Sequence, residues 1–267
     1  MLKDITLGQY FPGNTLMHRI DPRTKILLVM AIIVALFVCS SAPAYLVLAV
    51  YIFGLIAVSK LSLRMVLRGL KPLLVIIVFT GVLNLFLTPG DDILWRAGFV
   101  SITMAGVRKA ALIVARLVLL IAGASLLTYT TSPIQLTDGL ERLLAPLKRL
   151  HLPIHELAMM MSLALRFIPT LVEETDKIMS AQRARGADFD SGNLLHRAKA
   201  LIPILVPLFV SAFRRADELA TAMECRLYRG DIGRTRLRQL KFGRDDVICA
   251  ASAVLFLGGA IVLQVLP

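Results

Sequence analysis

The sequence has few of the residues on which enzyme chemistry and disulfide frameworks depend. Its 267 residues include only three cysteines, Cys39, Cys225 and Cys249, with neither metal-ligand spacing nor a disulfide pattern. It holds no Gly-Lys-Ser/Thr phosphate loop, no His-Glu-x-x-His zinc motif and no nucleophile constellation around a Ser or Cys. We therefore expect no catalytic residue, no cofactor and no metal. His151 and His155 are four positions apart, but no further ligand lies near them in the sequence.

Acidic residues and histidine are also missing from most of the long apolar segments. Hydrophobic residues make up 57% of the chain and the mean hydropathy is +0.75, which is typical of membrane proteins. The first 24 residues contain no apolar stretch of the kind found in a cleavable signal peptide. Five apolar blocks follow, at about residues 26–39, 45–58, 72–87, 105–127 and 247–266.

These blocks predict an all-α membrane protein with about five transmembrane helices. The last block has 20 residues without charge, enough for about 30 Å of helix. The first two blocks are short for a span, so we expect tilt, ragged ends or local membrane thinning. The expected organisation is an N-terminal membrane domain of about four helices (1–130), a cytoplasmic domain of long kinked helices (131–246) and a C-terminal transmembrane helix (247–267).

The formal net charge of +12 fits a protein that meets anionic lipid. Nucleic acid is not an expected partner, because the basic residues flank apolar runs and form no face shared with aromatic residues. Lysine and arginine gather before the first block and in residues 59–71, whereas the segments after the first and third blocks have almost none. This alternation predicts that the N-terminus and the 59–71 loop are cytoplasmic.

The fourth block differs from the others because it contains cations. Arg108 and Lys109, near its expected outer end, argue mildly against this orientation. Arg116 lies deeper and is a candidate functional residue inside the membrane. The alternative, an arginine that faces the helix bundle or extends toward the interface, explains it more simply.

Residues 131–246 carry charges of both signs, and their pattern predicts three helices. The first, about 133–150, has a hydroxyl N-cap candidate in Thr131-Ser132 followed by a proline, and Pro146 should bend it or end its regular part. The second, about 153–186, should kink at Pro169 and end at Gly186. The third, about 194–228, contains Pro203 and Pro207. Their apolar parts are too short to span a bilayer unaided, so we expect them to lie against the membrane face or each other.

Two arginines occur in matching contexts within this region. Arg185 lies nine positions after Asp176, and Arg226 lies nine positions after Asp217. In each helix the arginine falls where the apolar stripe would continue, following Ile178 in one case and, in the other, Leu219, Ala222 and Met223.

Two explanations fit a cation at a helix C-terminus. It stabilises the helix dipole by about 0.3–1 kcal/mol, which would account for either arginine alone. Two matched copies are better explained by docking, because a guanidinium can bind carboxylates and carbonyls of a partner through a fork of hydrogen bonds.

At these residues the chain resembles the transmembrane T component of energy-coupling factor transporters, which import vitamins and metals in bacteria and archaea. The family carries two short motifs with a central arginine at the ends of long coupling helices. Ala184-Arg185-Gly186 matches intact, whereas Cys225-Arg226-Leu227 keeps only the arginine. Further matches run along the chain: Gly8-Gln9-Tyr10-Phe11-Pro12-Gly13, His18–Lys25, Thr131-Ser132-Pro133, Leu165-Arg166-Phe167-Ile168-Pro169 and Gly233-Arg234-Thr235.

The resemblance implies a non-catalytic coupling subunit. Two cytoplasmic ATP-binding-cassette ATPases would each accept one motif, with docking residues Ala184, Arg185 and Gly186 in one case and Cys225, Arg226 and Leu227 in the other. Their closure on ATP would move a substrate-binding S component in the prokaryotic cell membrane. The difference between the two motifs fits two related but non-identical ATPases.

A self-contained secondary transporter is the alternative that the sequence leaves open. It would need substrate-binding polar residues near the membrane midplane and an inverted repeat. Only Thr80, Asn84 and Arg116 are suitable, and five spans divide poorly into halves. An intramembrane enzyme is less favoured, because it needs His, Asp or Glu inside spans and the five blocks contain none.

Overall fold

The structure is a computed structural model, and it describes residues 10–89, 92–97, 100–150, 152–187, 189, 193–230 and 240–265. The described chain divides into two compact units. A membrane unit comprises residues 10–140 and 240–265, and an arm unit comprises residues 141–230.

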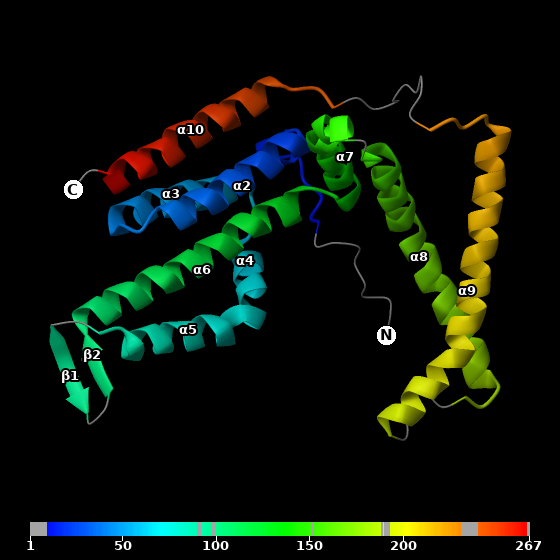
Figure 1. Cartoon of the computed structure of the whole chain (residues 1–267), viewed down its shortest axis with the longest axis horizontal. Helices are drawn as coiled ribbons and strands as arrows, with labels where there is room; N and C mark the ends of the chain where they lie inside the picture. The colour runs from blue at the N-terminus through cyan, green and yellow to red at the C-terminus, as the bar shows by residue number, and fades with distance from the viewer. Residues whose placement is uncertain are drawn as a thin grey trace. The chain divides into compact units, whose positions relative to one another are not determined.

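The membrane unit is built from packed helices with one small hairpin (Figure 1). Its elements in chain order are α1 (Leu16–Arg19), α2 (Pro22–Val38), α3 (Ala42–Val58), α4 (Leu63–Leu70), the 3-10 turn η1 (Lys71–Leu73), α5 (Leu74–Leu87), β1 (Ile93–Ala97), β2 (Val100–Thr103), α6 (Met104–Thr130) and α10 (Arg244–Val265).

Helix α6 lies at the centre of this unit. It packs against α2, α3, α4 and α5, while α10 packs against α2 and α3. The innermost side chains come from the two short helices: Ile32 and Leu36 of α2, and Leu48 and Ile52 of α3, are completely buried. Helices α2 and α3 therefore supply the centre of the core, and their outward faces keep large exposed apolar side chains, as expected where lipid is the solvent.

A polar network joins the start of α2 to the start of α10. Asp246 accepts hydrogen bonds from the backbone N–H of Asp21 (2.8 Å) and of Gly243 (2.7 Å). Asp21 in turn caps α2 by accepting from the Arg23 backbone N–H, and its carboxylate takes a forked contact from the Arg23 guanidinium at 2.7 and 3.0 Å. Lys25 donates to the Thr130 carbonyl at the end of α6 (2.9 Å). Much of the His18–Lys25 signature therefore has a structural role. We call the network around Asp21 and Asp246 the joint between α2 and α10.

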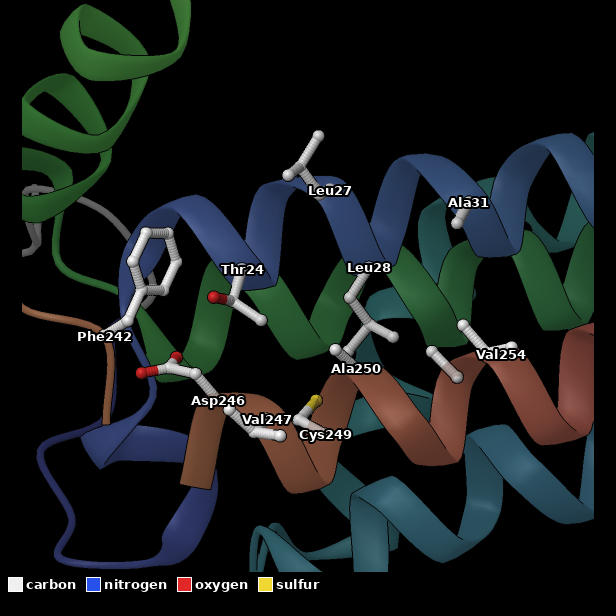
Figure 2. Close-up of a pocket in the computed structure, with 11 residues that line it drawn as sticks. Thr24, Leu27, Leu28, Ala31, Phe242, Asp246, Val247, Cys249, Ala250 and Val254 are labelled. Carbon is white, nitrogen blue, oxygen red and sulfur yellow. The ribbon is translucent and has the colours of Figure 1, made fainter. Parts of the chain in front are cut away.

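Beyond this joint, an apolar groove of about 390 Å³ follows the contact between α2 and α10. Figure 2 shows Leu27, Leu28 and Ala31 of α2 on one side and Val247, Ala250 and Val254 of α10 on the other. The one charged group on its lining is the carboxylate of Asp246, which already accepts hydrogen bonds from the backbone N–H groups of Asp21 and Gly243. The groove therefore offers no chemistry beyond apolar packing.

The hairpin β1–β2 was not predicted from the sequence. Its strands are antiparallel, with Ala97 opposite Val100 and Ile93 opposite Thr103. Residues of this segment such as Ile93, Trp95, Val100 and Ile102 have high β propensity. Thr103 connects the hairpin to α6: its buried hydroxyl accepts from the Gly106 N–H and donates to the Thr88 carbonyl, both at 3.0 Å.

Four helices among the described residues are long and apolar enough to span a membrane, by length and composition: Leu63–Leu87, Met104–Thr130, Ile154–Ala184 and Arg244–Gln264. Two of them contain the expected blocks 72–87 and 105–127, and a third covers most of the block 247–266. The first two blocks form α2 and α3, each of 17 residues, which confirms that they are short. The helix expected at about 153–186 is confirmed as α8 (Ile154–Ala184), which continues through Pro169. We expected its apolar part to be too short to span, but the whole helix is long and apolar enough by length and composition.

The arm unit consists mainly of two long helices, α8 (Ile154–Ala184) and α9 (Leu194–Cys225). The helix α7 (Pro133–Leu144), which precedes them, begins as expected. Ser132 and Gln135 exchange hydrogen bonds between side chains and backbone N–H groups at 3.3 Å, which makes a capping box. Its regular part stops at Leu144, and the 3-10 turn η2 (Ala145–Leu150) contains Pro146, which confirms the predicted ending.

Candidate functional site

Helices α8 and α9 form an antiparallel pair. Gln182 near the end of α8 reaches the carbonyl of Pro203 near the start of α9 (3.4 Å), and farther along Glu174 pairs with Arg215 (3.1 Å). The helices have 31 and 32 residues, so α8 is about 46 Å long at 1.5 Å per residue. The C-terminal ends of α8 and α9 therefore lie at opposite ends of the pair, as Figure 1 shows.

Proline lies inside both helices, as expected. Pro169 is within α8, and Pro203 and Pro207 are within α9. Figure 1 shows that α9 changes direction in its first half, the half that holds both of its prolines. A proline removes a helical hydrogen bond and pushes its ring against the preceding turn, which accounts for the bend.

Arg185 is the C-cap residue of α8, in a Schellman ending. The N–H of Gly186 bonds the Arg183 carbonyl (3.0 Å) and the N–H of Ala187 bonds the Gln182 carbonyl (3.0 Å). Gly186 has a positive φ of +88°, where glycine avoids the strain that a side chain would cause. The predicted end of the helix at Gly186 is therefore confirmed, with the arginine one position before it.

Arg226 occupies the same position at the end of α9. The N–H of Leu227 bonds the Glu224 carbonyl (2.9 Å) and the N–H of Tyr228 bonds the Met223 carbonyl (3.0 Å). Here the left-handed position is filled by a leucine, Leu227, with φ of +56°. The matched spacing in the sequence thus corresponds to a matched backbone geometry, and both arginines stand at the corner where a helix turns sharply away.

Both arginines are exposed, together with their flanking residues Ala184, Gly186, Cys225 and Leu227. Neither guanidinium forms a hydrogen bond or ion pair with any residue that the structure describes. The backbone of the Schellman motif already satisfies the helix-end carbonyls, so the side chains are not needed as caps. The two arginines, which share the same backbone geometry, can therefore contact a partner protein.

The two ends differ in what surrounds the arginine. Arg226 lines a groove of about 560 Å³ between the C-terminal part of α9 and the N-terminal part of α8. Two further arginines, Arg166 of α8 and Arg229, line the same groove, and both are exposed without a described partner. Its apolar lining includes Leu163 and Met223. Three arginines around a partly apolar hollow favour an acidic partner surface that also has an apolar contact.

Sequence reasoning missed the contribution of Arg166 and Arg229. Arg166 belongs to the Leu165–Pro169 motif, which was noted as part of the family pattern but given no role. It lies sixty positions before Arg226, and only the antiparallel pairing of α8 and α9 brings it to the same groove. A run of arginines spaced three apart, Arg226 and Arg229, was the sequence signal that could have indicated the second residue.

Arg116 is part of the helix packing in the membrane unit. Its Nε donates to the Tyr45 hydroxyl (2.6 Å) and its Nη2 donates to the Cys39 carbonyl (3.3 Å), while Tyr45 itself donates to the Leu36 carbonyl (3.1 Å). Its guanidinium also lies 5.7 Å from the ring centres of Phe37 and Tyr45. The structure supports the simpler explanation, an arginine that holds the ends of α2 and α3 against α6.

Of the two histidines four positions apart, only His155 lies among the described residues. Among them, no group of three or more His, Cys, Asp or Glu side chains could hold a metal ion. His155 is buried and forms a 2.9 Å contact between its Nδ1 and Oε1 of Glu141. His151 lies outside the described residues, as do Gly8, Gln9 and the Gly233-Arg234-Thr235 motif.

Comparison with known proteins agrees with this arrangement. The family model described as cobalt transport protein, CbiQ, matches residues 13–237. A protein of Ruminiclostridium cellulolyticum is 54% identical over 264 residues, which is 99% of this chain and 98% of its own length. A protein of Thermosediminibacter oceani is 54% identical over 97% of this chain and 98% of its own, and one of Bacillus subtilis is 46% identical over 96% and 97%.

All three relatives are named energy-coupling factor transporter transmembrane protein EcfT. The family match extends from the N-terminal joint to beyond the second arginine motif, and the relatives cover nearly the whole chain. The chain belongs to the EcfT family and is a transmembrane component of an energy-coupling factor transporter.

Proposed function

We propose that this chain couples two cytoplasmic ATPase subunits to a membrane-embedded S component that binds a vitamin or another micronutrient. The observation that carries this proposal is the pair of exposed arginines at matched Schellman endings, on opposite ends of an antiparallel helix pair. Each ATPase receives one arginine, with Ala184 and Gly186 beside Arg185, and Cys225 and Leu227 beside Arg226. The chain itself needs no catalytic residue, because ATP hydrolysis occurs in the partners.

The difference between the two endings supports two non-identical ATPases. The motif at Arg185 has small neighbours, Ala184 and Gly186, so a partner can approach its backbone closely. The motif at Arg226 adds Leu227, whose side chain is 74% exposed, and the neighbouring groove with Arg166 and Arg229. A partner at this end gains an apolar contact and additional cations.

An apolar surface on α9 supports an S component as the third partner. Leu205, Phe209 and Phe213 expose 45%, 60% and 70% of their surface, and they continue a face that also holds Ile202, Val206 and Val210. A continuous apolar surface of this kind is typical of a partner or membrane contact. Motion of α8 and α9 with the ATPases then moves the protein that rests on α9.

The arrangement of the membrane unit supports the proposed orientation, with the N-terminus on the cytoplasmic side. The backbone of Phe11 bonds Tyr129, and Tyr129 also contacts the carbonyl of Met65 in α4. The N-terminal segment and the basic 59–71 segment thus lie at the same end of α6, the end from which the chain continues to the arm helices. Basic residues concentrate on the cytoplasmic face of membrane proteins.

The test is to replace both arginines with glutamate, Arg185→Glu with Arg226→Glu, in the assembled transporter. We expect uptake into vesicles to be lost and co-purification of the ATPases to fall sharply, because two charge-assisted contacts become repulsive. Lys177→Glu with Arg214→Glu is the matched control, since both are exposed cations of the same helices away from the ends.

The control pair should leave assembly and uptake unchanged. Normal uptake by the arginine double variant would contradict docking at these ends. Uptake by the purified chain without any ATPase would instead favour the alternative, a self-contained secondary transporter.

A further inference from the structure

The segment between α3 and α5 has a pronounced charge imbalance. No Asp or Glu occurs anywhere in residues 22–90, whereas Lys60, Arg64, Arg68 and Lys71 fall within twelve positions. All four side chains are exposed, and none forms a hydrogen bond or ion pair with a described residue. These cations have no counter-charge in the part of the chain that the structure describes.

Helix α4 is fixed with its basic side outward. Val66 is only 3% exposed, and the Tyr129 hydroxyl of α6 donates to the Met65 carbonyl at 3.3 Å. These residues hold one side of α4 against α6. Leu67 and Arg68 lie on the other side, and Leu67 is 63% exposed. A helix that presents both cations and leucines outward suits a membrane interface, where headgroups meet hydrocarbon.

A groove of about 710 Å³ opens beside this outward face. Arg68 and Lys71 are its charged lining residues, and its apolar lining includes Leu67, Leu74, Val78 and Val118. Leu74 and Val78 are consecutive outward positions of α5 and are 55% and 53% exposed, so the apolar part of the groove extends along a membrane helix. We call this hollow the α4–α5 groove.

We propose that the α4–α5 groove binds one anionic phospholipid of the surrounding bilayer. The phosphate lies between Arg68 and Lys71, where the guanidinium supplies paired N–H donors and the ammonium a compact charge. An acyl chain follows Leu67, Leu74 and Val78 along α5. Basic pockets between membrane helices recognise anionic headgroups in this way.

The shape of the groove distinguishes a lipid from other anions. Free phosphate would satisfy the two cations but would leave the apolar lining of α5 and α6 empty. An acidic peptide would need to bring carboxylates and a continuous apolar stretch to a surface made of membrane helices. A phospholipid carries an anionic phosphate close to its apolar acyl chains, so it can fill the basic and the apolar part of the groove together. It is also the solvent on this side of the protein.

Fluorescence quenching tests the proposal. The sequence has a single tryptophan, so Trp95→Phe with Val78→Trp places one reporter in the groove. The full-length chain is reconstituted in phosphatidylcholine vesicles that contain either brominated phosphatidylglycerol or brominated phosphatidylcholine. We expect phosphatidylglycerol to bind up to about thirtyfold more tightly, because each of the two basic residues near anionic lipid contributes about 1 kcal/mol, roughly a factor of five.

Three variants make the test specific. Arg68→Gln with Lys71→Gln should abolish the preference for phosphatidylglycerol, while the exchange Arg68→Lys with Lys71→Arg should keep it. Arg108→Gln with Lys109→Gln removes the same charge from two exposed cations in the first turns of α6 and should leave the preference unchanged.

Several results would overturn the proposal. Equal quenching by both lipids, or an equal loss in the α6 control, would show that the groove has no selective site. Displacement of the brominated lipid by inorganic phosphate would identify a free-anion site. Complete protection of the reporter from both lipids in the assembled transporter would identify a protein partner at this surface.

Discussion

At the scale of single residues, Leu227 fills the left-handed position of its helix ending, a backbone conformation that is unfavourable for a residue with a side chain. Its φ of +56° is the position that Gly186 fills in the equivalent ending of α8, and its side chain is 74% exposed. A left-handed conformation costs a residue with a side chain roughly 1–2 kcal/mol. An exposed leucine in a strained position gains nothing within this chain, which agrees with a contact to a partner.

Replacing Leu227 with glycine should change the stability of the end of α9 and the binding of the ATPase in opposite directions. We expect Leu227→Gly to stabilise the end of α9 by about 1 kcal/mol, because the strain disappears. ATPase binding should weaken by roughly tenfold, since a fully buried leucine contributes about 1.5–3 kcal/mol. Thermal unfolding and a binding titration measure the two effects.

Gly186→Ala provides the reciprocal control for this prediction. It should destabilise the end of α8 by about 1 kcal/mol, because φ of +88° then carries a side chain. A Leu227→Gly variant that binds the ATPase as well as the parent chain would show that the leucine takes no part in docking.

Arg116 is a second residue whose role becomes clear from its contacts. We expect Arg116→Leu to lower the stability of the purified chain by about 1.5–3 kcal/mol, because hydrogen bonds from a charged group to Tyr45 and Cys39 are lost. Uptake per assembled transporter should remain normal. Full stability combined with lost uptake would instead assign Arg116 a direct part in transport.

At the scale of elements, the joint between α2 and α10 depends on ionised carboxylates. Burial alone would raise the pKa of Asp21, but the hydrogen bonds and charge of Arg23, together with the charge of Lys25, outweigh it and lower the pKa. A lowered pKa stabilises the fold above the ordinary Asp value of about 3.9, and this stabilisation is lost as pH falls through the lower folded-state pKa.

Asp21→Asn should therefore destabilise the chain at neutral pH by about 2 kcal/mol, and the difference from the parent should disappear as the pH falls through the lowered folded-state pKa of Asp21. Unfolding in detergent across this pH range measures the effect. Asp245→Asn is the control, because Asp245 has no hydrogen bond or ion pair with a described residue. A difference that persists at acid pH would mean that Asp21 acts through packing rather than through its charge.

At the scale of the whole molecule, the antiparallel pairing of α8 and α9 holds the two arginine motifs apart. Nitroxide labels at Ala181 and Ala222, one turn before each arginine and both exposed, report this separation in a Cys225→Ser background. The other two cysteines, Cys39 and Cys249, are buried. We expect a distance on the order of 25 Å in the assembled transporter without nucleotide, because each label lies seven residues, about 10 Å of helix, beyond the Glu174–Arg215 contact in opposite directions.

Closure of the ATPases should shorten this distance when ATP is added, because each end moves with its own subunit. Labels at Ala31 and Ala250, which face each other across α2 and α10 within the membrane unit, should stay unchanged. If the distance between the arm labels did not depend on ATP in an actively transporting sample, the proposed coupling through α8 and α9 would be contradicted.

Several features followed from sequence alone because they depend on neighbours in the chain. The apolar composition determined the membrane class, Ser132 and Pro133 determined the start of α7, and Gly186 determined the end of α8. The spacing of Arg185 and Arg226 predicted two equivalent positions, since helical periodicity and chain reversal are local properties.

Other features needed the tertiary structure because they join residues far apart in sequence. Arg166 shares a groove with Arg226 only through the pairing of α8 with α9, and Asp246 meets Asp21 only through the packing of α10 on α2. The contacts of Arg116 with Tyr45 and Cys39 likewise depend on the packing of α6 against α2 and α3. Composition and periodicity determine which faces are apolar, but the partner of each polar group is decided by which helices pack together.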